Sequence, residues 1–286
     1  MRTISAGTIE QAVTDLCVRA NLVLRADVLR ALKRALKRES SARARGILQA
    51  VIDNARAARL KRLALCQDTG MPVVFIEAGE RVCIAGDVRR AVNRGILRGY
   101  KRASLRNSIV SSPFVRRRPG YTPGVIHIEP ARGERLKLTV LPKGFGCENK
   151  SRLKMFNPTV EPEEIKDFVL QCVSDAGADA CPPFIVGVGL GGTADYACLL
   201  AKKALLKRIT PQSGTRGRKS VPAAFSALSA SSLLEAVNRL NIGPMGLGGR
   251  TTALAVHLET YPTHIAGMPV AVNISCHALR SATVIL

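Results

Sequence analysis

Residues 182–192 read PPFIVGVGLGG, an apolar run that ends in glycines and leads into a helix-forming segment over residues 194–208. A short run rich in Ile and Val predicts a buried strand, and the glycines predict a tight turn into the helix. These glycines fit neither a dinucleotide-binding fingerprint nor a P-loop. We interpret them as close packing of the backbone or, at most, as a contact with a carboxylate.

The segments before this strand alternate between helix, strand and loop patterns. Glu161–Asp175 is predicted to be a capped helix with Pro162 in its first turn. Residues 142–160 are polar and rich in Gly and Pro, so we expect a loop there. Residues 123–141 predict two strands that pair around an Arg132–Gly133 turn, because apolar residues alternate on both sides of it.

The segments after the helix over 194–208 continue the mixed pattern. Residues 209–222 predict an exposed, flexible loop, residues 231–240 a helix, and residues 252–259 a strand that follows a second glycine loop.

The N-terminal part differs from the rest in being helical. Residues 4–62 predict two or three helices, residues 72–79 a strand, residues 82–84 the start of another strand, and residues 87–101 a helix. The fold class is therefore mixed α/β. We expect one domain over residues 1–286, with a helical part over about 1–62 and an α/β part over about 63–286 in which helices pack on a sheet.

The chain is strongly basic, with 43 Lys and Arg against 21 Asp and Glu and a formal net charge of +22. Its basic residues are spread along the chain, aromatic residues make up 4%, and Trp is absent. We therefore favour a solvated basic surface, or a face for an acidic partner subunit, over nucleic-acid binding. A positive field also attracts a dianionic substrate.

The sequence has neither a signal-peptide pattern at its start nor an apolar run long enough for a membrane span, so we expect a cytoplasmic protein. Eight cysteines in such a chain do not predict disulfides, because the cytosol keeps thiols reduced.

Three of the cysteines are predicted to lie in loops among polar, turn-forming residues: Cys66, Cys181 and Cys276. Thiolates in such positions can reach a metal, and three of them on a four-iron cluster leave one iron open as a Lewis acid. Their wide spacing alone favours the other interpretation, that these are buried free cysteines.

Four long segments decide between these interpretations: CQDTGMPVVFIEAG (66–79), PKGFGCENKSRLKMFNP (142–158), CPPFIVGVGLGGTADYACLLAKKAL (181–205) and NIGPMGLGGRTTALAVHLETYPTHIAGMPVAVNISCHALR (241–280). They resemble the N-terminal catalytic domain of the class I, iron–sulfur-dependent fumarases and L(+)-tartrate dehydratases. In the two-subunit members of that family this domain is a separate α subunit. The resemblance covers nearly the whole chain.

The resemblance implies a [4Fe–4S] cluster, held by loops, on Cys66, Cys181 and Cys276. It places Gln67 and Asp68 at the substrate, where Asp68 is suited to proton transfer. Without the family match, Asp68 would be interpreted as a cap of the Thr69–Gly70 turn.

The resemblance also implies four further substrate-site residues and one catalytic residue. His264 matches the active-site histidine of the family, and Arg106 matches an arginine that pairs with a substrate carboxylate. Gly146, Asn149 and Lys150 lie in a loop that corresponds to a family loop with three glycines before Ser-Glu-Asn. Phe145 and Cys147 depart from that pattern. We rank Cys147 below the other three cysteines as a ligand.

By this resemblance the chain hydrates or dehydrates a four-carbon dicarboxylate, with fumarate to malate as the first hypothesis and L(+)-tartrate as the alternative. Further substrate-binding residues of the family belong to a β half that this sequence does not contain. We therefore expect a β subunit, an α2β2 assembly, and little activity from the α chain alone. A more distant alternative is a basic polyanion-binding protein on the same fold.

Overall fold

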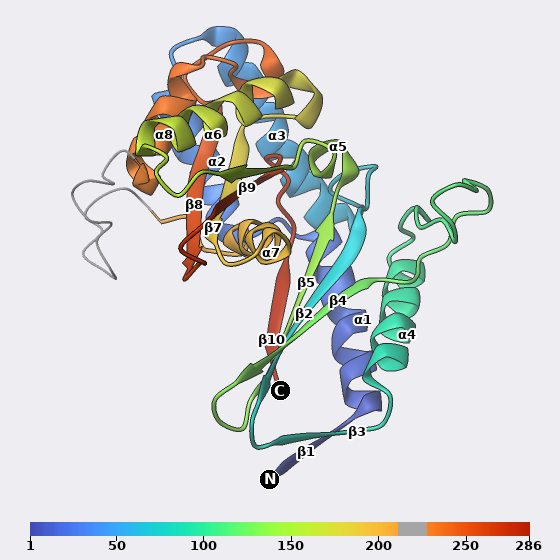
Figure 1. The fold of residues 1–286 in the computed structure, drawn as a ribbon. Helices are drawn as coiled ribbons and strands as arrows, with labels where there is room; N and C mark the ends of the chain where they lie inside the picture. Colours follow the sequence, from blue (N-terminus) through green and yellow to red (C-terminus); the bar gives the residue numbers. More distant parts are fainter. Residues whose placement is uncertain (211–227) are drawn as a thin grey trace. The chain divides into compact units, whose positions relative to one another are not determined.

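Helices and strands alternate along the chain in the computed structural model, which describes residues 1–210 and 228–286, so the predicted mixed α/β class is confirmed (Figure 1). The described residues form two units, and each is described by itself. Unit 1 comprises Met1–Arg25, Asn54–Phe145 and Arg280–Leu286, and unit 2 comprises Ala26–Asp53 and Gly146–Leu279.

Unit 1 contains a four-stranded sheet, a small parallel strand pair and two helices. Its elements are β1 (Arg2–Ser5), α1 (Ala6–Leu22), β2 (Met71–Gly79), β3 (Val82–Ala85), α4 (Val88–Arg102), β4 (Val125–Ala131), β5 (Leu136–Lys143) and β10 (Ala282–Ile285). The larger sheet has the order β10-β5-β2-β4, and β1 pairs with β3. β10 is therefore contributed by the last segment of the chain.

Strands β4 and β5 do not pair with each other, so the predicted strand pair around Arg132–Gly133 is wrong. β2 lies between them, with Val73 opposite Val125 of β4 in parallel register and opposite Leu141 of β5 in antiparallel register. The reason is the run VVFI in β2, which is buried on both faces and is typical of a central strand. Alternation within β4 and β5 shows that they are strands, but it does not show which strand lies between them.

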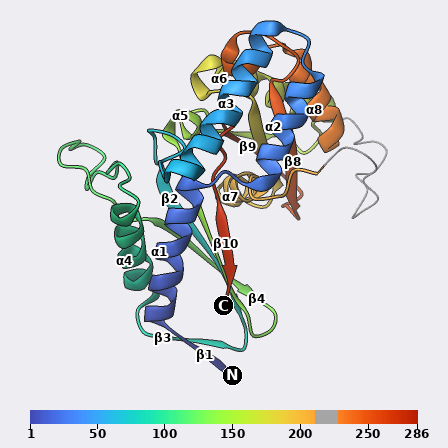
Figure 2. The same cartoon turned by 180° about the vertical axis from the view of Figure 1, so that it is seen from behind.

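Helices α1 and α4 lie side by side in unit 1 (Figures 1 and 2). Two glycines one turn apart on α4 allow this approach. A Cβ at Gly95 would lie 2.6 Å from the carbonyl oxygen of Glu10, and a Cβ at Gly99 would lie 2.7 Å from the Cβ of Cys17. The other face of α1 packs on the sheet, where Leu138 and Val140 are fully buried.

Unit 2 contains a second four-stranded sheet with helices on both faces. Its elements are α2 (Ala26–Arg38), β6 (Arg152–Phe156), α6 (Pro162–Ala176), η1 (Ala178–Ala180), β7 (Phe184–Gly191), α7 (Ala194–Ala204), α8 (Ala230–Arg239), η3 (Pro244–Gly246), β8 (Ala253–Tyr261) and β9 (Met268–Ser275). The sheet order is β6-β9-β7-β8. The helices α3 (Ala42–Lys61) and α5 (Phe145–Glu148) have residues in both units.

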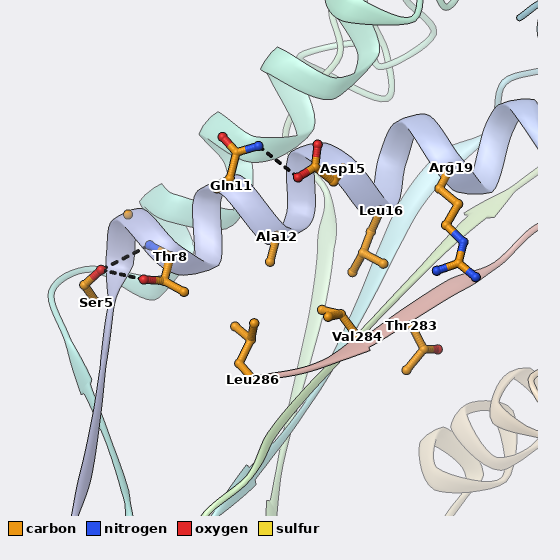
Figure 3. Close-up of a pocket in the computed structure, with 11 residues that line it drawn as sticks. Ser5, Thr8, Gln11, Ala12, Asp15, Leu16, Arg19, Thr283, Val284 and Leu286 are labelled. Atoms are coloured by element: carbon orange, nitrogen blue, oxygen red, sulfur yellow. Dashed lines mark hydrogen bonds between the residues drawn. The ribbon is translucent and has the colours of Figure 1, made fainter.

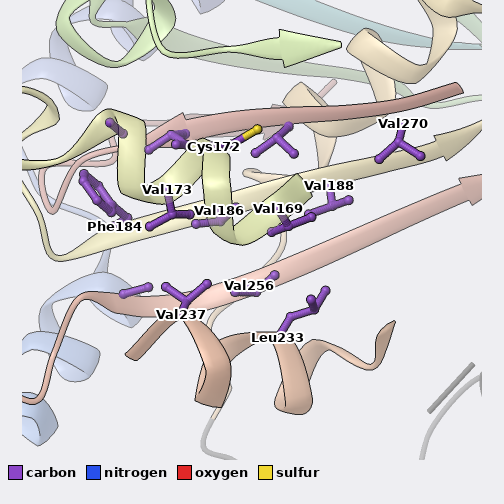
Figure 4. Packing of buried hydrophobic residues seen from close by; sticks show 14 of the residues in the cluster. Val169, Cys172, Val173, Phe184, Val186, Val188, Leu233, Val237, Val256 and Val270 are labelled. Carbon is purple, nitrogen blue, oxygen red and sulfur yellow. The ribbon is translucent and has the colours of Figure 1, made fainter. Parts of the chain in front are cut away.

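Strand β7, which lies within residues 182–192, has two different faces. Val186 and Val188 point into a core that α6 and α8 cover, and Figure 4 shows them beside Val169 of α6 and Leu233 of α8. The alternate positions are glycines against α7: a Cβ at Gly187 would lie only 2.1 Å from the carbonyl oxygen of Ala201. The glycines therefore serve close packing, which is the first of the two interpretations from the sequence.

The expected loop over residues 142–160 is partly wrong, because it contains α5 and β6. β6 is an edge strand that pairs only with β9 in the described sheet, and four of its five residues are exposed. Its alternation covers only Arg152–Met155, which is too short a run to stand out among the turn-forming residues around it.

Most of the helix predictions agree with the structure. Helices α1–α3 confirm the helical region over residues 4–62, and α4, α6 and α8 match the predicted ranges within about two residues. Helix α7 ends at Ala204, earlier than residue 208. The predicted loop over 209–222 lies, beyond residue 210, outside the described residues. None of the helices in the described part of the chain combines the length and the apolar composition that a membrane crossing needs.

We predict that Gly99→Ala destabilises the protein by about 1–3 kcal/mol, because the new methyl group overlaps Cys17 and forces α4 away from α1. Gly46→Ala in α3 is the matched control, since nothing lies within 4 Å of the Cβ it would add. That change should stabilise by about 0.5–1 kcal/mol. Urea unfolding of both variants measures the two shifts. Equal effects of the two substitutions would contradict the close helix packing.

Candidate functional site

Cys66 lies in unit 1, in the loop between α3 and β2, and hydrogen bonds hold this loop on several sides. The backbone NH of Leu65 donates to the carbonyl oxygen of Asn21 at 2.9 Å, and Tyr100 Oη donates to the carbonyl oxygen of Thr69 at 3.0 Å. Gly70 has φ +73°, and a Cβ there would lie 2.8 Å from the backbone of Pro142. The position of the Cys66 loop is therefore fixed by the fold around it.

The carboxylate of Asp68 is oriented by two backbone NH groups. Oδ1 accepts a hydrogen bond from Gly70 at 3.0 Å and Oδ2 accepts one from Phe145 at 2.8 Å. The first of these bonds is the turn cap that the sequence indicated for Asp68. The second bond joins the Cys66 loop to Phe145, which ends the Asn54–Phe145 segment of unit 1.

Arg106 lies next to the same loop. Thr69 Oγ1 donates to the carbonyl oxygen of Arg106 at 2.9 Å, while Arg106 itself is exposed. The Sγ of Cys66 donates to Oε1 of its neighbour Gln67 at 3.3 Å. Unit 1 thus brings together Cys66, Gln67, Asp68 and Arg106.

Three buried polar residues lie beneath this loop, and sequence reasoning missed all of them. Asn21, Tyr100 and Arg280 are at most 4% exposed. Arg280 Nη1 donates to Asn21 Oδ1 at 3.4 Å. Burial raises the pKa of Tyr100, so its hydroxyl remains protonated and donates to the loop. Of the three, only Arg280 could have been predicted as a site neighbour, because it ends the NISCHALR segment that also contains Cys276.

In unit 2 the antiparallel pairing of β7 and β9 brings Cys181 and Cys276 to the same end of the sheet. Ile185 of β7 pairs with Ser275 of β9, so the residues just before β7 and just after β9 are neighbours. His277 Nδ1 donates to the carbonyl oxygen of Cys181 at 3.0 Å, which joins the two segments directly. Cys181 ends the η1 turn in the left-handed conformation, with φ 55° and ψ 64°.

The segment with Gly146, Asn149 and Lys150 lies beside Cys181 in unit 2. Lys150 Nζ forms an ion pair with Asp179 at 3.1 Å and donates to the carbonyl oxygen of Asp175 at 3.3 Å. A Cβ at Gly146 would lie 3.9 Å from the carbonyl oxygen of Asp179. Asn149 is exposed. Gly146 and Lys150 therefore lie close to the segment that leads to Cys181.

A polar network anchors this segment to β9 and α7. The carboxylate of Glu148 forms an ion pair with Lys202 and accepts a hydrogen bond from Asn273 Nδ2 at 3.1 Å. Asn273 Nδ2 also donates to Ser151 Oγ at 2.9 Å. Since Asn273 lies three residues before Cys276, the network ties the two segments together.

His264 lies at the opposite end of the same sheet from the two cysteines. It follows β8, whose last residue Tyr261 pairs with Gly191 at the far end of β7. Eight residues of extended strand separate the ends of β7, which corresponds to roughly 25 Å. The side chain of His264 is exposed, and its Nδ1 accepts from the backbone NH of Ala266 at 3.2 Å. Unit 2 therefore does not bring His264 to Cys181 and Cys276.

The other five cysteines differ from the three in the loops. Burial raises the pKa of Cys172 on α6 to about 12, and it also raises the pKa values of Cys17 and Cys198. Cys147 is buried, and its thiol donates to the carbonyl oxygen of Ala180 at 3.3 Å. Cys83 lies on β3. By contrast Cys66, Cys181 and Cys276 are each partly exposed and lie outside regular helices and strands.

In the described part of the chain no three His, Cys, Asp or Glu side chains gather closely enough to hold a metal ion. Cys66 belongs to unit 1, and Cys181 and Cys276 belong to unit 2. As a donor set the three fit a cluster: they are thiols in partly exposed loops, and hydrogen bonds fix the backbone of two of these loops.

A separate groove of about 750 Å³ lies in unit 1 between α1 and β10 (Figure 3). Side chains from one face of α1 and from the last residues of the chain line it, including Asp15, Arg19 and Leu286. It contains none of the predicted site residues.

Comparisons with known proteins agree with the resemblance. A family model described as "Fumarate hydratase (Fumerase)" matches residues 10–285. The chain is 38% identical to the "Putative L(+)-tartrate dehydratase subunit alpha" of Methanocaldococcus jannaschii, over 96% of each chain. It is 30% identical to the "L(+)-tartrate dehydratase subunit alpha" of Escherichia coli K12, over 91% of this chain and 84% of that protein. The chain therefore belongs to the fumarate hydratase (Fumerase) family.

Proposed function

We propose that this chain is the α subunit of a hydro-lyase that adds or removes water across a carbon–carbon bond of a four-carbon dicarboxylate. The observation that carries this proposal is the family match over residues 10–285, which includes every residue of the candidate site. The relatives named above are tartrate dehydratase α subunits, which supports the same reaction class.

A [4Fe–4S] cluster on Cys66, Cys181 and Cys276 completes the proposal. These are the cysteines in partly exposed loops, whereas Cys17, Cys147 and Cys172 are buried thiols. When bound, the cluster supplies a Lewis-acidic iron, because three thiolates leave one of its four irons without a protein ligand.

The chain's own residues have separate tasks in the proposed reaction. The exposed guanidinium of Arg106 holds one substrate carboxylate, for which its planar fork is well suited. Asp68, oriented by Gly70 and Phe145, accepts or returns a proton at its carboxylate. Gln67 contacts the substrate from the same loop, and Gly146 and Asn149 contact it from unit 2. Lys150 also holds the Asp179–Cys181 segment through its ion pair.

Two substrates are candidates. The family description names fumarate hydratase, which is consistent with fumarate, the first hypothesis from the sequence. The names of the relatives support L(+)-tartrate as the second candidate. The two acids share the two carboxylates that Arg106 and its neighbours would hold.

A β subunit is the proposed partner, because both relatives are named as α subunits. Within the proposal, the β subunit supplies the remaining cationic groups for the substrate. The proposed assembly is α2β2.

We predict that the α chain alone shows little or no turnover and that the αβ complex is active. Anaerobic assays of both preparations on fumarate, L-malate and L(+)-tartrate measure this. The faster acid identifies the substrate. Full turnover by the purified α chain would overturn the β-subunit part of the proposal, and an inactive αβ complex with a full iron content would overturn the substrate class.

We predict that Cys66→Ala, Cys181→Ala and Cys276→Ala each lose the reconstituted cluster, because each removes a ligand. Iron content and the EPR signal after anaerobic reconstitution measure the loss independently of activity. Cys83→Ala and Cys198→Ala are matched controls outside the site, and Cys147→Ser tests the nearest competing thiol. A normal iron content in all three alanine variants would show that the ligands are wrong.

We propose that His264 acts in the site of the second α chain. It lies roughly 25 Å along the sheet from Cys181 and Cys276, so it does not meet a substrate held at the cluster of its own unit 2. An α2β2 assembly contains a second α chain whose His264 can complete the site.

We predict that inactive His264→Asn and inactive Asp68→Asn α chains recover activity when they are mixed and reassembled with β subunit. Half of the assemblies then contain one chain of each kind, and one of their two sites is intact, which gives about a quarter of the wild-type activity. Anaerobic assays before and after mixing measure the recovery. No recovery after verified subunit exchange would place His264 and Asp68 in one chain's site.

A further inference from the structure

An arm of unit 1, defined as residues 106–120, extends from the Cys66 loop. Its base is closed by Ile109 and Gly120, whose backbones exchange hydrogen bonds of 3.0 and 2.7 Å, and by Asn107 Nδ2, which donates to the carbonyl oxygen of Pro119 at 2.8 Å. Arg106 at its start accepts the hydrogen bond from Thr69. The arm is thus a closed loop with a fixed base, and Figure 1 shows it beyond the end of α4.

The tip of the arm exposes apolar and cationic side chains together. Phe114 is 93% exposed and Val115 is 54% exposed, and the three following residues, Arg116–Arg118, are exposed as well. A Phe side chain this exposed buries almost no apolar surface within its own chain. Aromatic residues and Arg are the types enriched at protein–protein interfaces.

Unit 1 offers few acidic groups to these arginines. It contains 23 of the 43 Lys and Arg residues but only 8 of the 21 Asp and Glu residues. Seven of the eight acids have partners elsewhere in unit 1: Glu10, Asp15, Asp68, Glu77, Glu80, Asp87 and Glu134. Among the described residues, Arg116–Arg118 form no ion pair.

We propose that the arm is the docking element for an acidic surface of the β subunit, with Phe114 and Val115 inserted into an apolar pocket and Arg116–Arg118 paired with carboxylates around it. This inference rests on the proposed function, since it names the contact that joins the two subunits. Charge complementarity selects this occupant: Arg116–Arg118 need carboxylates, whereas unit 1 of a second copy offers 23 basic residues and only 8 acidic ones, of which seven already have partners.

Nucleic acid fits the tip less well than a protein does. Its phosphates would pair with the arginines and a base could stack on Phe114, but the neighbouring Val115 would stay exposed to solvent. The arm also lies next to the predicted substrate arginine, because Arg106 is its first residue. A β subunit bound to the arm is therefore held beside the Cys66 loop.

The test compares two triple charge reversals of equal size. One variant carries Arg116→Glu, Arg117→Glu and Arg118→Glu, and the control carries Arg2→Glu, Arg132→Glu and Arg135→Glu, all at exposed positions elsewhere in unit 1. Affinity for the cognate β subunit is measured by sedimentation velocity at low and high salt. We expect roughly 100-fold weaker binding for the arm variant and less than threefold weaker binding for the control.

A second pair of variants tests the apolar part. Phe114→Ala should weaken β-subunit binding by roughly tenfold, whereas Ile128→Thr on β4, which removes another exposed apolar side chain, should not change it. Wild-type affinity for the β subunit in both arm variants would overturn the inference. It would also be overturned if the wild-type chain binds single-stranded RNA and the arm variants lose RNA binding but still bind the β subunit. A basic β-subunit surface would also overturn it.

Iron content and turnover of the wild-type complex are measured in the same preparations. An arm-dependent α–β complex without cluster or activity would overturn the proposed function and leave the docking inference intact. An active complex that forms equally well with the arm variants would overturn the docking inference and leave the proposed function intact.

Discussion

Strand β7 pairs with β9 in antiparallel register, Ile185 opposite Ser275, and this pairing determines which predicted site residues of unit 2 lie together. It places the segment before β7 beside the segment after β9, so Cys181 and Cys276 are neighbours although 94 residues separate them in the sequence. The parallel pairing of β7 with β8 has the opposite consequence for His264, which follows β8 at the far end. A shift of the register by one residue would turn Val186 and Val188 from the core toward α7, where only glycine fits. The packing of the core therefore fixes the position of the cysteines.

Unit 1 positions its part of the site by a different means. The hydroxyl of Tyr100 donates a hydrogen bond to the Cys66 loop, and the carbonyl oxygen of Asn21 accepts one from it. Both residues are almost without solvent contact. Such bonds contribute only about 1 kcal/mol each to stability, but the loss of one partner leaves a buried polar group unsatisfied. Displacement of the loop therefore costs more free energy than the hydrogen bonds contribute to folding. The network thus serves to position Cys66 and Asp68 more than to stabilise the fold.

The sequence predicted those features of the fold that depend on local pattern, and it failed where strand order matters. Helices such as α6, with its Pro162 and its capping box, are encoded within a few residues. The place of β2 between β4 and β5 depends on burial of VVFI from both sides, and β6 is a short edge strand whose alternation covers only four residues. For the candidate site, the cysteines are predicted from the family segments and not from their spacing. Tyr100 and Asn21 lie in predicted helices, and the sequence pattern of a helix does not show that a polar residue in it is buried beneath a site.

The surplus of positive charge has two explanations, attraction of a dianionic substrate and association with an acidic protein. Both predict a dependence on salt, because exposed charges are screened beyond about 10 Å. They differ in what they require beside the charge. A small dicarboxylate needs only the field and Arg106, and it gives no reason to expose Phe114 and Val115 at the tip of the arm. A protein partner accounts for the apolar pair and the three arginines together. It also neutralises the tip of the arm, while Arg106 at the base stays near the Cys66 loop.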